Sequence, residues 1–225
     1  MCAGVHPYLY ATAKVGWKHI KARQVTDEVP TRASCEPESI DAGTKNHPIC
    51  RDAPKARENT FMNELAQALI GDSAAAPPAH ILEGIAEELA YRSLQFAPHT
   101  IYEELWHIAF WQQVTLDWVT GIETPFPTEP AAGFPNKSDT DLEPWSQLRQ
   151  RFFDGLEKAA AAAADEKRQD QQVRCPSRPG KPVRIMTVRE QLESLAAHNA
   201  YHFGRIVLLR QLCQAWPPPS GGFSW

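Results

Sequence analysis

Apolar side chains recur every three or four residues in several long stretches of the chain, the spacing that places them on one face of an α-helix. Segments rich in proline, glycine and polar residues separate these stretches. No useful length of sequence alternates apolar and polar residues, so the pattern predicts helices and no strands. The predicted helices cover residues 59–70, 80–91, 100–120, 141–164 and 187–213.

Two of the long helices begin with the same signal. Thr100 with Glu103, and Thr187 with Glu190, each have the form of a capping box. In that arrangement the hydroxyl and the carboxylate satisfy backbone amides that have no partner within the first turn. Gly121 is suited to end the helix that Thr100 begins, because glycine readily adopts the left-handed conformation of a C-terminal cap.

The remaining segments read as connections. Residues 124–139 and 171–186 are rich in proline and predict loops, and Pro144 is compatible with the first turn of a helix that begins near Asp141. Residues 1–58 mix proline, threonine, serine and charges without a sustained period, and they bury too little apolar surface to offset the entropy of ordering.

Four long helices, each with an apolar stripe, indicate an all-α four-helix bundle, with the short helix at 80–91 packed on one end. The predicted organisation is a poorly ordered N-terminal extension at 1–58 followed by a bundle domain at 59–225.

Composition excludes several classes of function. The chain has 23 Lys and Arg against 27 Asp and Glu, a formal net charge of −4, so it lacks the basic surface that nucleic-acid binding requires. The sequence contains no run of about 18 apolar residues, so it predicts no membrane span. The first residues lack the pattern of a signal peptide, and the 5 cysteines show neither CxxC spacing nor an even number. We therefore expect a cytoplasmic protein with free thiols.

Three of the 8 histidines fall inside long helices, on or beside the apolar stripe. His198 and His202 are four residues apart, so a helix stacks both imidazoles over one turn. His107 lies on the stripe of another helix, where a bundle can bring it opposite the pair. Three imidazoles on one divalent metal ion would leave a coordination position open, which is typical of catalytic sites. The alternative is three core histidines that bind nothing.

Two other kinds of metal site do not fit these residues. A zinc peptidase helix reads HExxH, whereas the residue after His198 is Asn199, which cannot act as a general base. A di-iron bundle needs two Glu-x-x-His units and two further glutamates. Glu104 and His107 form one such unit, but Leu195 and Asn199 supply no carboxylate.

Several residues near these histidines have two interpretations. Glu104 is either a charge that the helix dipole favours near an N-terminus or a group that orients a ligand or accepts a proton, and the first is the simpler. Arg205 and Arg210 either hold an anionic substrate or are solvated at the surface, and solvation is the simpler for both. Trp106, Trp111 and Trp118 either shape a pocket wall or pack in the core. Asn199 and Tyr201 either line the pocket, pack in the core or face solvent.

The stretch from His99 to Trp111 (HTIYEELWHIAFW) resembles the second helix of the DinB-like (YfiT-like) superfamily. The stretch from Ala197 to Arg210 (AHNAYHFGRIVLLR) resembles its last helix, and the tail from Trp216 to Trp225 is also similar. The resemblance runs from about Asn59 to the end of the chain, and the preceding extension has no counterpart.

The resemblance implies a four-helix bundle with a three-histidine site for zinc or nickel, and a homodimer. Matched residue by residue, the ligands are His107, His198 and His202. Activities in the family imply a metal-dependent enzyme that acts on a small molecule, with thiol S-transferase chemistry and a low-molecular-weight thiol as the leading expectation. A metal-dependent hydrolase and a non-catalytic metal-binding bundle are the alternatives.

Overall fold

The computed structural model describes residues 63–71 and 75–221, so the predicted extension at 1–58 and the predicted first helical residues at 59–62 lie outside the described residues. The helices and strands, in chain order, are α1 Glu64–Ile70, α2 Pro78–Ile81, α3 Glu87–Ala90, α4 Ile101–Thr120, η1 Pro130–Gly133, α5 Lys137–Leu142, α6 Trp145–Ala164, η2 Glu166–Arg168, β1 Gln172–Cys175, β2 Arg184–Thr187 and α7 Val188–Leu212.

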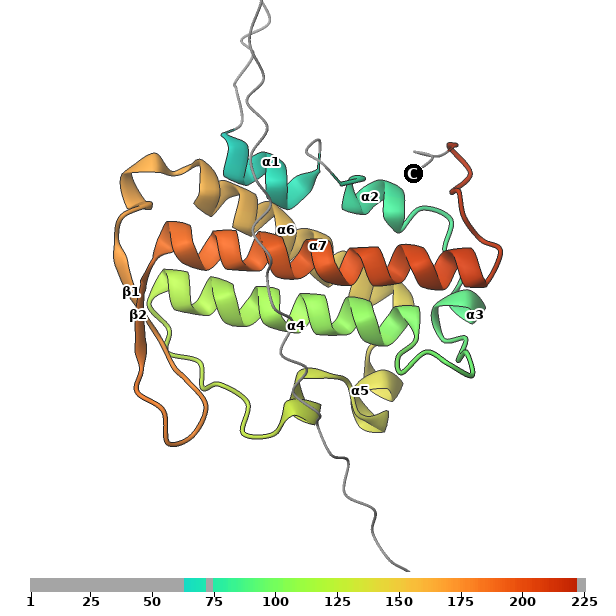
Figure 1. Cartoon of the computed structure of the whole chain (residues 1–225), viewed down its shortest axis with the longest axis horizontal. Helices are drawn as coiled ribbons and strands as arrows, with labels where there is room; N and C mark the ends of the chain where they lie inside the picture. The colour runs from blue at the N-terminus through green and yellow to red at the C-terminus, as the bar shows by residue number, and fades with distance from the viewer. Residues whose placement is uncertain (1–62, 72–74, 222–225) are drawn as a thin grey trace, which may run out of the picture. The chain divides into compact units, whose positions relative to one another are not determined.

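Helices α1, α4, α6 and α7 pack against one another as a four-helix bundle, which confirms the predicted all-α fold. In Figure 1, α4 and α7 lie side by side with α6 behind them. The predicted apolar stripe of α6 is wholly buried in the core. That stripe consists of Trp145, Leu148, Phe152, Leu156, Ala159 and Ala163.

Helix α7 runs antiparallel to α4, whereas α6 runs parallel to it. Contacts between α4 and α7 pair Glu104 with His202 and Thr115 with Gln191, so the numbering descends on one helix as it ascends on the other. The connection from α4 to α6 must therefore return along the bundle, a distance of about 30 Å for a helix of 20 residues. This return segment passes beside the middle of α4, where η1 contacts it.

The predicted capping boxes of α4 and α7 and the predicted glycine cap of α4 are confirmed. Thr100 and Glu103 form a complete capping box on α4, as Thr187 and Glu190 do on α7. Gly121 caps the end of α4 in the left-handed conformation, with φ of 91°.

The predicted single helix at 80–91 is wrong, because the structure has two short helices there, α2 and α3. Gly84 separates them with φ of +66°, a backbone conformation that does not continue a right-handed helix. A Cβ at Gly84 would also lie 2.9 Å from Pro219, so the C-terminal segment packs against this turn.

The prediction that the third long helix begins near Asp141 is also wrong. Asp141 belongs to α5, and α6 begins at Trp145 with Pro144 as its N-cap. The break lies at Glu143, which has an extended backbone (φ −122°, ψ 96°). A residue before proline disfavours the helical conformation because the proline ring contacts its backbone.

The absence of strands was predicted wrongly as well. The segment 171–186, interpreted as a linker, contains an antiparallel hairpin in which Val173 pairs with Met186 and Cys175 with Arg184. Val173 and Cys175 are buried while their neighbours are exposed, but this alternation lasts only four residues, too short to stand out in the sequence. The hairpin lies at one end of α4 and α7 (Figure 1).

Within the described residues, Cys175 and Cys213 are free thiols. None of the helices in that part of the chain has the length and apolar character needed to cross a membrane.

Gly155 lies where α6 packs against α4, and it has room for no side chain. A Cβ there would lie 2.1 Å from Nε2 of Gln112. That amide is buried and donates a hydrogen bond of 2.9 Å to the carbonyl of Phe152. We expect Gly155→Ala to lower the free energy of unfolding by about 1–3 kcal/mol, although alanine favours helices, since Gln112 must move and leave this bond.

Gly204 on α7 provides the matched control, because a Cβ there would meet nothing within 4 Å. Gly204→Ala should leave the free energy of unfolding unchanged or raise it by up to about 1 kcal/mol. Urea denaturation of both variants measures the difference. Equal effects of the two substitutions would show that contact with Gln112 does not limit position 155.

Candidate metal centre

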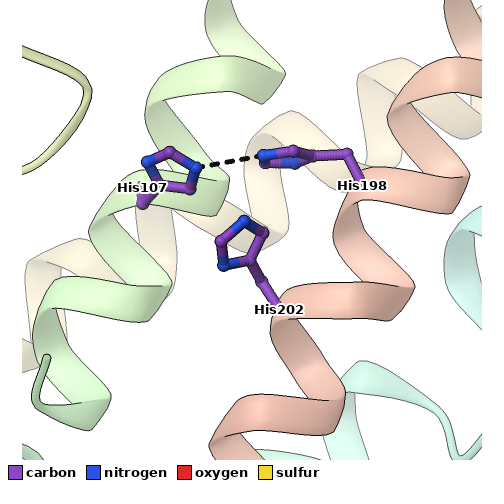
Figure 2. A group of neighbouring side chains, drawn as sticks. All are labelled: His107, His198 and His202. Carbon is purple, nitrogen blue, oxygen red and sulfur yellow. Dashed lines mark hydrogen bonds between the residues drawn. The ribbon is translucent and has the colours of Figure 1, made fainter. Parts of the chain in front are cut away.

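The structure brings the three predicted histidines together from two helices. His107 projects from α4, and His198 and His202 project from successive turns of α7, with all three rings facing one another (Figure 2). One nitrogen from each ring can be chosen so that all three lie within 4.8 Å of one another. The Nε2 atoms of His107 and His198 are 3.1 Å apart.

Acceptors on the outer side of each ring determine where the protons lie. Nδ1 of His107 is 2.7 Å from the carbonyl oxygen of Gly133, and Nδ1 of His202 is 2.7 Å from Oε2 of Glu104. A carbonyl and a carboxylate accept but do not donate, so both Nδ1 atoms carry a proton. Nδ1 of His198 also faces an acceptor, the side-chain oxygen of Asn199, at the longer distance of 3.4 Å. Nε2 of His107 and Nε2 of His202 are then left with their lone pairs, and Nε2 of His198 lies 3.1 Å from that of His107.

These lone pairs fit a cation. Nε2 of His107 and Nε2 of His198 are 3.1 Å apart, so one ring can donate a hydrogen bond to the other when its proton lies on Nε2, and both nitrogens can bind a cation when neither carries a proton. Nitrogen ligands lie about 2.0–2.1 Å from zinc, so two imidazoles on one tetrahedral ion are roughly 3.3 Å apart. The pair His107 and His198 matches this spacing, and together with His202 the three imidazoles form a group that could hold a divalent metal ion.

His107 and His198 carry no positive charge of their own at neutral pH. Burial lowers the pKa of His107 to about 4, with the neighbouring imidazoles of His202 and His198 adding to the decrease. Burial and the nearby His202 likewise lower the pKa of His198 to about 4. Both rings are therefore neutral near pH 7, which is the form that binds metal.

Glu104 is fully buried between the two helices, and its carboxylate has two partners. One oxygen accepts from Nδ1 of His202, and the other accepts from Nε of Arg205 at 2.7 Å. Burial alone would raise the pKa of Glu104, but the hydrogen bonds from His202 and Arg205 outweigh it and hold the pKa below its usual value. The simpler interpretation, a charge stabilised only by the helix dipole, is therefore incomplete for this residue.

A cavity of about 480 Å³ opens beside the three histidines. Its wall between α4 and α7 carries Trp111, Trp118 and Leu195 beside the imidazoles, together with the polar side chains of Thr115, Gln191 and Ser194. Phe126 and Arg184 reach the cavity from the loop after α4 and from the hairpin. Small molecules bind in concave sites of this kind, where a few polar groups lie among apolar side chains.

The other residues singled out in the sequence divide between cavity and core. Tyr201 lines the cavity with Trp111 and Trp118, whereas Trp106 stacks on Phe110 and lies outside it. Asn199 is buried beside His198 and is not part of the cavity wall.

The expectation of a solvated surface position is wrong for Arg210. This side chain is 2% exposed, donates to the carbonyl oxygens of Ile81 and Ala215, and lies over the ring of Trp216. It anchors the end of α7 to α2 and to the following segment. Arg205 is also engaged, through its bond to Glu104.

Gly133 and Phe134 contact the site but had no signal in the sequence. The carbonyl of Gly133 accepts from His107, and a Cβ at position 133 would lie 3.5 Å from Nδ1 of that ring. Phe134 stacks on His107 with ring centroids 4.2 Å apart and on His99 with centroids 3.8 Å apart. Both residues belong to the returning connection, whose path depends on the packing of the whole bundle.

The lowered histidine pKa values predict how the stability of the metal-free protein depends on pH. Between about pH 6.5 and 4, an unfolded chain protonates His107 and His198 whereas the folded protein does not. The unfolded state then binds more protons, so the free energy of unfolding should fall as pH falls through this window. Urea midpoints at pH 7 and pH 5 measure this. In His107→Gln the difference should be smaller, and an equal difference in both proteins would contradict the assignment.

A sequence profile of the DinB superfamily matches residues 78–206, from the start of α2 to within α7. The matched region contains His107, His198 and His202. No curated protein matches the chain significantly.

Proposed function

Because the chain belongs to the DinB superfamily, we propose that it is a metal-dependent enzyme that holds one zinc or nickel ion through His107, His198 and His202. The observation that carries this proposal is the arrangement of the three imidazoles, whose outer nitrogens are engaged while the inner nitrogens converge beside an open cavity. A purely structural site would be closed by a fourth protein ligand. Within the described residues, the group that could hold a metal ion contains three histidines.

The residues around the histidines have positioning roles in this proposal. Glu104 accepts from Nδ1 of His202 and so directs Nε2 of that ring inward, while Arg205 holds the carboxylate in place. The carbonyl of Gly133 does the same for His107. Such outer partners fix the tautomer and orientation of metal-binding imidazoles. Since both oxygens of Glu104 are occupied, orientation of His202 accounts for this residue better than proton transfer does.

The chemistry proposed is thiol S-transfer to a small electrophile. A bound divalent ion supplies Lewis acidity, which lowers the pKa of a thiol or of water at neutral pH. The thiol loses its proton to solvent or buffer, its sulfur forms a bond to the electrophilic carbon, and the leaving group departs from that carbon. The aromatic wall formed by Trp111, Trp118 and Phe126 excludes water and holds the apolar part of the electrophile.

The test is a thiol-conjugation assay on protein loaded with zinc or nickel. Cysteine and glutathione serve as thiols, and 1-chloro-2,4-dinitrobenzene serves as an electrophile whose conjugate is followed by absorbance. We expect the wild type to exceed His202→Ala by at least roughly tenfold in rate above the uncatalysed reaction. His99→Ala, a histidine outside the group of three, should retain the wild-type rate.

Two other results would replace this proposal. Turnover only with hydrolysable esters, again dependent on His202, would assign a metal-dependent hydrolase, the alternative that the same open site allows. Stoichiometric metal with no turnover in either assay would indicate a non-catalytic metal-binding bundle. The homodimer and the cytoplasmic location stay predictions.

A further inference from the structure

Three neighbouring hollows share lining residues, and together they are called the cleft here. The cavity next to the imidazoles shares Phe126 and Arg184 with a second hollow of about 440 Å³. The second shares Phe126 and Arg178 with a third of about 350 Å³, which returns to His107 and Trp111. The cleft therefore reaches from the three imidazoles to the hairpin between β1 and β2.

The hairpin end of the cleft is cationic. Arg178, Lys181 and Arg184 all line the second hollow, although the whole chain has a formal net charge of −4. Within residues 63–71 and 75–221, none of these three side chains forms an ion pair with a carboxylate. By contrast, Arg174 of the same hairpin is bound to Glu123 at 2.7 Å. The charges that face the cleft are thus available to a ligand.

Two of these cations lie over aromatic rings that line the cleft. The guanidinium of Arg178 lies 5.8 Å from the ring centre of Phe126, and that of Arg184 lies 6.0 Å from the ring centre of Trp118. Stacking on a ring leaves the N–H groups at the edge of a guanidinium free to donate. The backbone of Arg184 is also held in place, because this residue pairs with buried Cys175 in the hairpin.

The distribution of charge along the cleft favours one orientation of a bound ligand. Glu129 is the carboxylate that lines the third hollow, and the second hollow is lined by cations, Phe126 and small residues. The wall between the cations and the imidazoles contains Trp111 and Trp118. An anionic group fits the hairpin end, an apolar body fits the aromatic wall, and the reacting end then lies at the histidines.

We propose that this cleft selects an organic carboxylate with an apolar body, whose carboxylate is bound by Arg178 and Arg184 with Lys181 beside them. The proposal names the substrate class for the metal-dependent activity proposed above and rests on it. A guanidinium binds a carboxylate through two parallel hydrogen bonds, which gives orientation as well as affinity. The two arginines therefore determine which end of the substrate faces the three imidazoles.

The experiment compares 4-phenylbutyrate with its neutral counterpart, 4-phenylbutyramide, by titration calorimetry on the full chain loaded with zinc. The wild type should bind the carboxylate at least about tenfold more tightly than the amide. Arg178→Gln combined with Arg184→Gln should remove this preference and leave amide binding unchanged. Each single substitution should weaken the preference in part, and circular dichroism checks the fold of every variant.

Arg174→Gln is the matched control, since it removes one positive charge from the same hairpin outside the cleft. Its preference for the carboxylate should stay within about twofold of the wild type. If Arg174→Gln lowers the preference for the carboxylate as much as Arg184→Gln does, the preference arises from the overall charge of the hairpin, and the proposal is overturned. Equal binding of the two probes by the wild type, or binding of neither, would overturn it as well.

His202→Ala separates this inference from the proposed function. The variant should lose the metal yet keep the preference for the carboxylate, because Arg178 and Arg184 do not depend on His202. If the wild type prefers the carboxylate but shows no thiol transfer, the substrate class assigned to the cleft stands and the proposed reaction is wrong. If the wild type shows thiol transfer but no preference for the carboxylate, the proposed reaction stands and the substrate class is wrong.

Discussion

His202→Ala is expected to abolish stoichiometric metal binding while the helix content of the protein stays unchanged. His202 is one of three imidazoles whose ligand nitrogens lie within 4.8 Å of one another, and it is the one whose outer nitrogen is bound by a buried carboxylate. Two remaining imidazoles leave the ion mostly to solvent. Loss of an outer partner costs about 10–100-fold in metal affinity, so loss of a ligand itself should exceed about 100-fold.

Elemental analysis of purified protein, together with competition against a chelator, measures this change. His99→Ala is the control, since His99 stacks on Phe134 at the start of α4 without belonging to the group of three. Far-ultraviolet circular dichroism establishes that helicity is retained. Unchanged zinc or nickel content in His202→Ala would mean that the histidines do not form a metal site, and the proposed enzyme would have no catalytic centre.

Glu104→Gln is expected to weaken metal binding by about 10–100-fold without abolishing it. The amide oxygen of glutamine can still accept from Nδ1 of His202, but it lacks the charge that makes the carboxylate a strong acceptor. The amide group also faces Arg205, which loses its anionic partner. Because the substituted side chain has nearly the same shape, packing between α4 and α7 should be preserved.

The dissociation constant for zinc separates a positioning role from a structural one. Glu103→Gln is the control, because Glu103 is the neighbouring carboxylate and serves the capping box at Thr100 rather than the three histidines of the site. That variant should bind zinc within about twofold of the wild type, since glutamine also completes a capping box. A zinc affinity in Glu104→Gln equal to that of the wild type would show that Glu104 does not position His202.

Prediction from sequence worked where a few neighbouring residues determine the outcome. The capping boxes at Thr100 and Thr187 depend on residues three apart, and both formed as expected. Prediction from sequence was wrong where a single local feature interrupted a periodic apolar pattern. Glu143, restricted by the proline that follows it, separates α5 from α6, and Gly84 divides the predicted helix at 80–91. The four-residue strands of the hairpin were too short to detect against three nearby prolines.

Helical spacing in the sequence alone determined that His198 and His202 share a face of one helix, that His107 lies on the inner stripe of another, and that the chain forms a bundle. Only the tertiary structure decided that Glu104 and Gly133 hold the outer nitrogens of two of these rings, and that the hairpin brings Arg178 and Arg184 to the same cleft. The physical reason is the range of the interactions. Spacing along one helix follows from its 3.6-residue turn, whereas the partners of these rings come from segments 26 and 98 residues away and meet them only because the bundle is packed.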